Sequence, residues 1–340
     1  MAAAHGRKPK RTPKSAGALK KKAVRKSAKK SKIKNSKRTT SRRAKTSPGA
    51  GPKYVERLVE TRGIVTEDLR VFRFAGVSLG GGKTDKTAVA ILEFYPDKKR
   101  VFLRSLREKI STSGEVSADE ALIRILSEEE KNLTSIAFDV PLQVPKCFRC
   151  ELKCPGIEKC TEPEVKWMRD MHKKRAKQKR PNKMFTPYTE RPAEIYISHE
   201  LEEPFHPSHA LGSNAAPLTA RARFLSRRLR SPMIEVYPKL SLWRIGTDLD
   251  IPKSYLRFHR HAVDSDEARL FILRTLIDKE IAFIYQQDLR EMVENNVAFE
   301  AFICALTAFL RYRGQTEKCP ASFPKGEAWI EFPNKEIQWF

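Results

Sequence analysis

The chain has 340 residues, of which 40% are hydrophobic, so it is long enough for one large or two ordinary domains with a real core. It carries 67 lysines and arginines against 41 aspartates and glutamates, a net charge of +26. It has no apolar run of about eighteen residues or more and no apolar secretory segment at the N-terminus. We therefore expect an intracellular protein without membrane spans, located in the cytoplasm or associated with a nucleoid or nucleus.

The first part of the chain is a basic segment. Residues 1 to 53 hold 20 lysines and arginines and no acidic residue. They have few large apolar side chains to offset the entropy of ordering, so we predict a disordered basic arm over residues 1–55. The stretch KKKAVRKSAKKSKIK resembles the tails of linker-histone-like proteins, whose lysines neutralise nucleic-acid phosphates. The alternative is a solubilising or localising tail without a fixed partner.

Three strands are predicted after the arm. They occupy residues 72–79, 86–95 and 100–108. The first two are apolar and flank a glycine-rich turn, and the third alternates apolar and polar residues, which indicates an antiparallel meander. An amphipathic helix over residues 117–129, with Ser117 as N-cap, then leads into a buried strand over residues 133–141. A strand after such a crossover lies parallel to its predecessor in the sheet.

The later elements are mainly helical. Helices are predicted at about residues 218–229, 264–278 and 293–313, and a strand at PMIEVYP. A short cationic helix is expected in KWMRDMHKKRAKQKRPNK, ended by Pro181 and anchored by Trp167, Met168 and Met171. Its lysines contact a polyanion or form a solvated face. Arg191 in the following segment contacts phosphate or packs, and Arg221 lies on a solvated helix face.

Four of the six cysteines form a cluster with the spacing C-x2-C-x3-C-x5-C. They are Cys147, Cys150, Cys154 and Cys160. Four neighbouring thiolates satisfy tetrahedral Zn²⁺, and we expect a structural zinc site that holds the basic helix near the sheet. An iron–sulfur cluster and unmetallated or redox-active thiols are the alternatives. Cys304 is expected in the core.

Several segments carry a resemblance to a known family. FAGVSLGGGKTDKTAVAIL, SIAFDVPLQVP, PMIEVYPKLSLW, FEAFICALTAFLRY and GEAWIEFP resemble, in this order, the motifs of the domain-of-unknown-function family 429, described as predicted RNase H-like nucleases. The resemblance covers about residues 70–335. It implies an α/β domain of RNase H-like fold, with the cysteine-rich, basic segment at about residues 144–190 as an insertion.

The resemblance also implies a set of catalytic carboxylates. RNase H-like nucleases hold Mg²⁺ or Mn²⁺ between carboxylates of the first strand, a middle strand and the last helix. The candidates here are Asp139, Glu235 and Glu300. Each has a structural alternative, such as Asp139 capping a turn or Glu235 pairing with a lysine or arginine. The first-strand position, commonly Asp in the family, is Ser78, and Asp85 is a candidate substitute.

The sequence GGGKT invites a nucleotide-binding interpretation. A Walker A loop needs a glycine six residues before its lysine, but the residue at that distance from Lys83 is Val77. A strand pattern follows where a phosphate loop requires a helix. Lys83 nevertheless stays a candidate phosphate contact, together with Ser78 and Asp85, because actin-like ATPases share this strand-turn-strand opening.

Three functional hypotheses follow from these residues. The leading one is a nucleic-acid-binding, metal-dependent nuclease that hydrolyses phosphodiester bonds. The second is a catalytically inactive nucleic-acid-binding module, which Ser78 favours. The third is an enzyme acting on a nucleotide or another phosphate metabolite.

Overall fold

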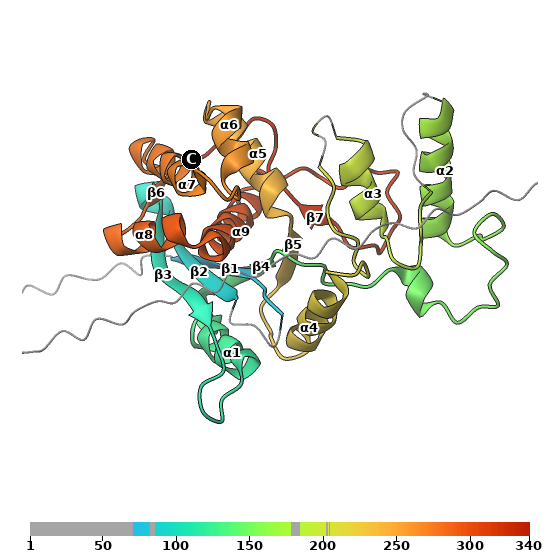
Figure 1. Ribbon diagram of the computed structural model, residues 1–340, viewed down its shortest axis with the longest axis horizontal. Coiled ribbons are helices and arrows are strands. Elements are labelled where there is room, and N and C mark those ends of the chain that lie inside the picture. The colour runs from blue at the N-terminus through green and yellow to red at the C-terminus, as the bar shows by residue number, and fades with distance from the viewer. Residues whose placement is uncertain (1–70, 82–85, 178–183, 202, 204) are drawn as a thin grey trace, which may run out of the picture. The chain divides into compact units, whose positions relative to one another are not determined.

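The computed structural model describes residues 71–81, 86–177, 184–201, 203 and 205–340 (Figure 1). The chain divides into two units, Met1–Ile64 and Val65–Phe340, and every described residue belongs to the second. The predicted arm at residues 1–55 lies outside the described residues, as do Lys83 and Asp85 of the glycine-rich turn.

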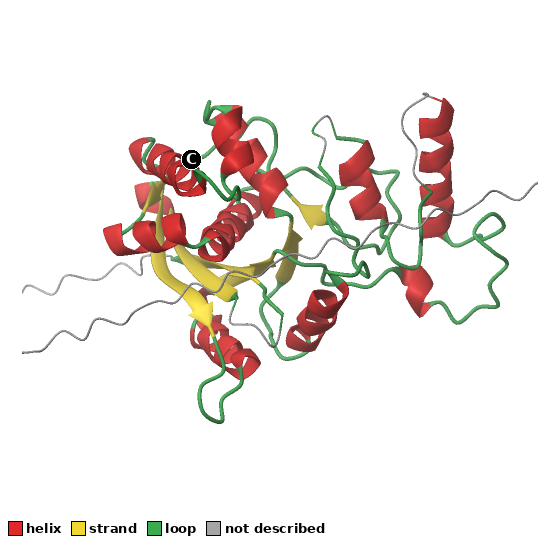
Figure 2. Ribbon diagram, viewed as in Figure 1, coloured by secondary structure: helices red, strands yellow, loops and turns green. Residues whose placement is uncertain are grey.

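In this part of the chain, seven strands form one mixed sheet in the order β6-β3-β2-β1-β4-β5-β7 (Figure 2). The strands are β1 (Phe72–Ser78), β2 (Thr87–Tyr95), β3 (Arg100–Ile110), β4 (Leu133–Phe138), β5 (Met233–Val236), β6 (Ala282–Phe283) and β7 (Ile330–Glu331). β1, β2 and β3 form the predicted antiparallel meander, and β4 and β5 continue the sheet parallel to β1. The predicted α/β class is confirmed, whereas β6 and β7 are too short to be recognised in the sequence.

Helices cover both faces of the sheet. The helices of the described residues are α1 (Ala118–Glu128), α2 (Pro163–Lys177), α3 (Pro192–His199), α4 (Ala216–Ser226), α5 (Pro238–Asp248), α6 (Lys253–Phe258), α7 (Ser265–Asp278), α8 (Gln286–Glu294) and α9 (Asn296–Tyr312), of which α2 and α3 lie beside the sheet (Figure 1). Leu122 of α1 and Ala222 of α4 belong to the core on the face of Ala75 and Val77. Figure 1 shows α5 to α9 on the opposite side. Because both faces are covered, all residues of β2 except its last are buried.

The N-terminus of α1 forms as the sequence predicts. The side-chain oxygen of Ser117 accepts a hydrogen bond from the backbone N–H of Glu120 at 3.1 Å. This bond satisfies one of the free N–H groups at the start of the helix. The N-cap prediction is therefore confirmed.

The apolar helix α9 lies directly on β1, and Gly76 makes this contact close. A Cβ atom on Gly76 would lie 2.0 Å from the carbonyl oxygen of Ala301 and 2.3 Å from the backbone nitrogen of Ala305. Every residue of α9 from Ala298 to Leu310 is buried. The two backbones therefore touch at a point where only glycine fits.

The start of α9 differs from the sequence prediction of one helix from about residue 293. Asn295 interrupts it, since its side chain accepts hydrogen bonds from the backbone N–H groups of Val297 at 2.9 Å and Ala298 at 3.4 Å. The preceding α8 is bent by 115° from α9. No single helix in the described residues is long and apolar enough to cross a membrane, although α8 and α9 meet that criterion as a bent pair.

The segment between β4 and β5 carries α2, α3 and α4, and α2 and α3 lie beside the sheet in Figure 1. The predicted basic helix is confirmed as α2, while Pro181 lies outside the described residues. Met168 is buried and Trp167 packs against Phe323, with ring centroids 5.6 Å apart, as expected for these two anchors, whereas Met171 is only partly buried. The lysines stay at the surface, and one of them, Lys174, pairs with Glu200 at 2.7 Å.

We predict that Gly76→Ala weakens the domain strongly, because the added Cβ meets backbone atoms that cannot rotate away. The free energy of unfolding should fall by about 3 kcal/mol, the upper range for overpacked cores. Gly114→Ala is the control, since no atom lies within 4 Å of the position that its Cβ would take and its φ is +57°. There the loss should be about 1 kcal/mol, from the left-handed backbone alone. Equal losses in urea unfolding of the two variants would contradict the close contact.

Candidate functional site at the carboxyl edge of the sheet

Three parallel strands, β1, β4 and β5, end at the same edge of the sheet. Ser78 is the last residue of β1, Asp139 directly follows β4, and Glu235 lies in the second half of β5. Glu300 lies in α9, one residue before the close contact with Gly76. The topology thus places all four sequence candidates at this end of the sheet. Glu235 lies between Ile234 and Val236, which pack on the α9 side, so its side chain is on the opposite face of the sheet from Glu300.

Asp139 connects the ends of β1 and β4. Its Oδ2 accepts a hydrogen bond from the Ser78 hydroxyl at 2.6 Å, and its Oδ1 accepts one from the backbone N–H of Leu79 at 2.8 Å. Burial raises the pKa of Asp139 to about 7, although these two hydrogen bonds act in the opposite direction. The negative charge of Glu300 raises this pKa further and the positive charge of Arg260 lowers it. Asp139, Ser78 and Glu300 therefore form one electrostatic group.

Glu300 is held by an arginine that sequence reasoning did not single out. Two nitrogens of the Arg260 guanidinium contact the same carboxylate oxygen of Glu300. Glu300 is buried, whereas Arg260 is partly open to solvent. Cys304 lies one turn further along α9 in the core, as predicted, and burial raises the pKa of its thiol, with a further contribution from Asp139.

Glu235 is also paired with an arginine. Arg191, at the start of α3, donates to both oxygens of Glu235, at 2.8 and 2.5 Å, and its Nε donates to Glu194 at 2.8 Å. The backbone N–H of Leu142 donates to Glu235 at 3.1 Å. Burial alone would lower the pKa of Arg191, but the charges of Glu235 and Glu194 raise it above its ordinary value. The alternative that Glu235 pairs with an arginine is confirmed. A phosphate contact of Arg191 is not confirmed, because this side chain is fully buried.

These pairings decide how the residues fit a divalent metal. Mg²⁺ and Mn²⁺ prefer several oxygen ligands that carry negative charge. Glu235 and Glu300 already have their charges matched by guanidinium groups, and Ser78 brings no charge. Across the described ranges, no group of three or more His, Cys, Asp or Glu side chains is placed to hold a metal ion. The arrangement therefore does not fit a site for two catalytic metals.

Arg221 of α4 contacts Gly80 and Thr87, which lie on either side of the glycine-rich turn. Its guanidinium contacts the carbonyl oxygen of Gly80 and donates to Thr87 Oγ1 at 3.0 Å and to Asp119 at 2.7 Å. Arg221 is buried, so its assignment to a solvated helix face is wrong. The helical pattern of α4 did not reveal this, because the partners of Arg221 come from residues more than 100 positions away.

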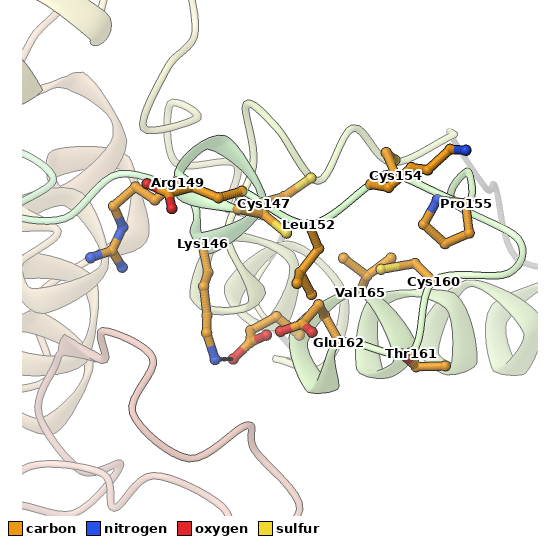
Figure 3. A pocket seen from close by; sticks show the side chains of 14 residues that line it. Lys146, Cys147, Arg149, Leu152, Cys154, Pro155, Cys160, Thr161, Glu162 and Val165 are labelled. Atoms are coloured by element: carbon orange, nitrogen blue, oxygen red, sulfur yellow. Dashed lines mark hydrogen bonds and ion pairs between the residues drawn. The ribbon is translucent and has the colours of Figure 1, made fainter.

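The four clustered cysteines line one cavity of about 400 Å³ next to the start of α2 (Figure 3). Figure 3 shows Cys147 on one side of it and Cys154 and Cys160 on the other. All four are free thiols. Burial raises the pKa of Cys147, and the three other cysteines add to this shift. The cysteines thus share one cavity, but no three of them are close enough for a common metal ion.

A family model described as "Protein of unknown function (DUF429)" matches residues 82–325, more than two thirds of the chain. The chain belongs to this family. Neither a curated protein nor a solved structure matches the sequence significantly. The predicted DUF429 membership is confirmed, and the description of the family names no activity.

We expect Asp139→Asn to change how the stability of this DUF429 protein depends on pH. The folded-state pKa of Asp139, about 7, lies above its ordinary value of 3.8, so the folded state binds this proton more tightly than the unfolded chain. Its contribution to stability is full below about pH 4 and is lost as the pH rises through about 7. Urea unfolding between these limits should show wild type losing stability relative to Asp139→Asn. Asp97→Asn, at an exposed site, is the control, and a constant difference between wild type and Asp139→Asn would contradict the shift.

Proposed function

We propose that this DUF429 protein has an RNase H-like fold and binds nucleic acid at the carboxyl edge of its sheet, as a module without metal-dependent cleavage. The fold assignment is supported by the order of elements. A three-stranded meander is followed by the helix-linked parallel strands β4 and β5 and is closed by the C-terminal helix α9. This is the arrangement that RNase H-like domains have.

The absence of cleavage is inferred from one observation, the pairing of both glutamates with arginines. A nuclease of this fold needs its carboxylates free for a cation. Arg191 and Arg260 instead neutralise Glu235 and Glu300. Lys239, in the first turn of α5, lies close enough to sense the charges of Arg260 and Glu300. The edge is therefore better suited to an anion than to a divalent cation.

Two further basic segments support a polyanionic partner. The exposed lysines of α2 include Lys173 and Lys177, and residues 1 to 53 add 20 basic side chains. Each lysine or arginine that neutralises a phosphate releases a counterion from the nucleic acid. Affinity from such contacts is large and falls steeply with salt.

A metal-dependent nuclease is the second candidate, and one observation favours it. Asp139, Ser78 and Glu300 come from β4, β1 and the last helix and form one electrostatic group. These are the elements from which RNase H-like nucleases take their ligands. In this candidate, Asp139, Glu235 and Glu300 would hold Mg²⁺ or Mn²⁺, which would supply charge stabilisation at the leaving oxygen. The ion pairs of Arg191 with Glu235 and of Arg260 with Glu300 would first have to break.

We also propose a structural Zn²⁺ bound by Cys147, Cys150, Cys154 and Cys160. It is supported by their spacing and by their positions around one cavity. Because no three of these thiols lie close enough for one ion in the structure, the cysteine loop would have to close around the metal on binding. Arg169 of α2 already fixes this loop, since its guanidinium donates to the carbonyl oxygens of Ile157, Glu158 and Cys160 at 2.9 to 3.1 Å. Zinc would join the cysteine loop to α2 more firmly, because Cys160 lies three residues before the first residue of that helix, Pro163.

Binding and cleavage of labelled single-stranded, duplex, hybrid and branched nucleic acids separate the two candidates. Wild type, Asp139→Asn and Glu300→Gln should bind equally, without cleavage in Mg²⁺ or Mn²⁺. The logarithm of the binding constant should fall linearly with that of the salt concentration, with a slope of about 0.9 per duplex phosphate neutralised. Metal-dependent cleavage that both variants lose would establish the nuclease instead. Absence of salt-dependent binding would refute both.

The zinc proposal predicts one tightly bound Zn²⁺ per chain. Replacing it with Co²⁺ should give the intense near-ultraviolet absorption of thiolate coordination, because four thiolates supply the ligands. Cys147→Ser and Cys160→Ser should lose the metal, while Cys319→Ser, at an exposed cysteine outside the cluster, should keep it. Metal-free protein, or equal loss in all three variants, would contradict the site. The broad visible absorption of an iron–sulfur cluster would show that the four cysteines bind such a cluster and not zinc.

A further inference from the structure

A cavity of about 430 Å³ adjoins the candidate site. Its walls come from the end of β5, from α5 and α6, and from the loops around residues 206 and 260. Arg260 lines the cavity and also contacts Glu300, so the cavity lies next to this carboxylate of the candidate site. Its volume lies within the range of about 300–1,000 Å³ typical of small-molecule sites.

The polar lining of the cavity is cationic. Lys239, Arg257 and Arg260 line it, and none of the aspartates and glutamates that the structure describes does. Lys239 is half-buried and has no ion-pair or hydrogen-bond partner among the described residues. Burial lowers the pKa of Lys239 and the nearby Arg260 lowers it further, while the charge of Glu300 acts in the opposite direction. A half-buried ammonium group without a partner is costly, and an anion in the cavity would supply the missing charge.

Aromatic side chains form another part of the wall. Phe205 packs edge-on against Tyr237 and Trp243, with ring centroids 6.2 and 5.8 Å apart. The guanidinium of Arg257 lies 5.7 Å from the centroid of the Trp243 ring. Bases stack on such aromatic rings and on guanidinium planes. Cationic and aromatic groups thus meet in one cavity of small-molecule size.

His259 gives the cavity a neutral hydrogen-bond acceptor. Its Nδ1 lies 2.7 Å from the carbonyl oxygen of Leu256 and therefore carries the hydrogen of this bond. Burial lowers the pKa of His259 to about 4, which keeps the ring neutral and leaves Nε2 as an acceptor. Such an acceptor suits a sugar hydroxyl or a base N–H group, not a second anion.

We propose that this cavity binds one nucleotide unit, with its phosphate at Lys239, Arg257 and Arg260 and its base against the wall of Phe205 and Trp243. This inference rests on the proposed function and narrows it to a place and a ligand. A free mononucleotide and a nucleotide within a nucleic-acid strand share this chemistry. Competition between a free mononucleotide and a nucleic-acid strand distinguishes which of them supplies the bound nucleotide.

The test is calorimetric titration of the full chain, at about 0.15 M salt to screen the exposed lysines, with adenosine 5′-monophosphate, adenosine and inorganic phosphate. The mononucleotide should bind at one site per chain and more tightly than either part alone. Lys239→Met should weaken it about tenfold, as expected for a lost charge-assisted hydrogen bond. Arg257→Met, at an exposed position, should also weaken it and is a second variant in case Lys239→Met fails to fold.

Lys253→Met is the matched control. It removes the same charge beside the same tryptophan, since Lys253 Nζ lies 5.7 Å from the Trp243 centroid, but Lys253 does not line the cavity. Its affinity for the mononucleotide should stay within about twofold of wild type, because its charge is screened by solvent. Equal losses in the three variants, or no binding to wild type, would overturn the proposal.

The two proposals fail in different ways. If labelled nucleic acid binds and the mononucleotide does not, the cavity is not a nucleotide site, while the proposed function stands. If the mononucleotide binds with the expected variant effects and nucleic acid does not, the cavity proposal stands and the proposed function fails. If both bind and the mononucleotide displaces a single strand, the cavity takes its nucleotide from the strand.

Discussion

The contact between the backbones of α9 and β1 at Gly76 is the constraint on which the candidate site depends. Ala301 and Ala305 lie so close to Gly76 that no side chain fits between them. This fixes both the height and the rotation of α9 over the sheet. Glu300, the residue before Ala301, is thereby set near the ends of β1 and β4, where its charge acts on Asp139. Without this contact, the carboxylates of helix and sheet would not form one group.

Electrostatic balance then decides what the site can do. Arg191 is fully buried and lies between two buried carboxylates, while Arg260 pairs with Glu300 at the rim. Removing one member of a buried ion pair leaves an uncompensated charge, which destabilises the fold. In each pair, the arginine and the glutamate therefore depend on one another. Asp139 differs because hydroxyl and amide groups, not cations, contact it directly. Burial brings the pKa of Asp139 to about 7, near neutral pH.

The sequence was sufficient for strands β1 to β5, the meander and the N-cap at Ser117, because these depend on local alternation and on nearest neighbours. It also placed Asp139 and Glu300 correctly, since strand ends and a helix start locate them. It was not sufficient for Arg260 or for which arginine pairs with Glu235. Those partners lie 40 and 44 residues apart along the chain, and an arginine carries no local sign of its partner. The cavity beside them joins segments from three parts of the chain, so no single motif reveals it.

The segment between β4 and β5 leaves and rejoins the sheet at neighbouring points, since Ile136 pairs with Met233 and Phe138 with Glu235. Such an excursion changes length in evolution without disturbing the strands around it. Arg191 restricts this freedom, because it comes from the excursion and its charge is matched by Glu235 of the sheet. A change in the segment that removed Arg191 would take away the cation that matches Glu235. We therefore expect loss of Arg191 and replacement of Glu235 by a neutral residue to occur together in related chains.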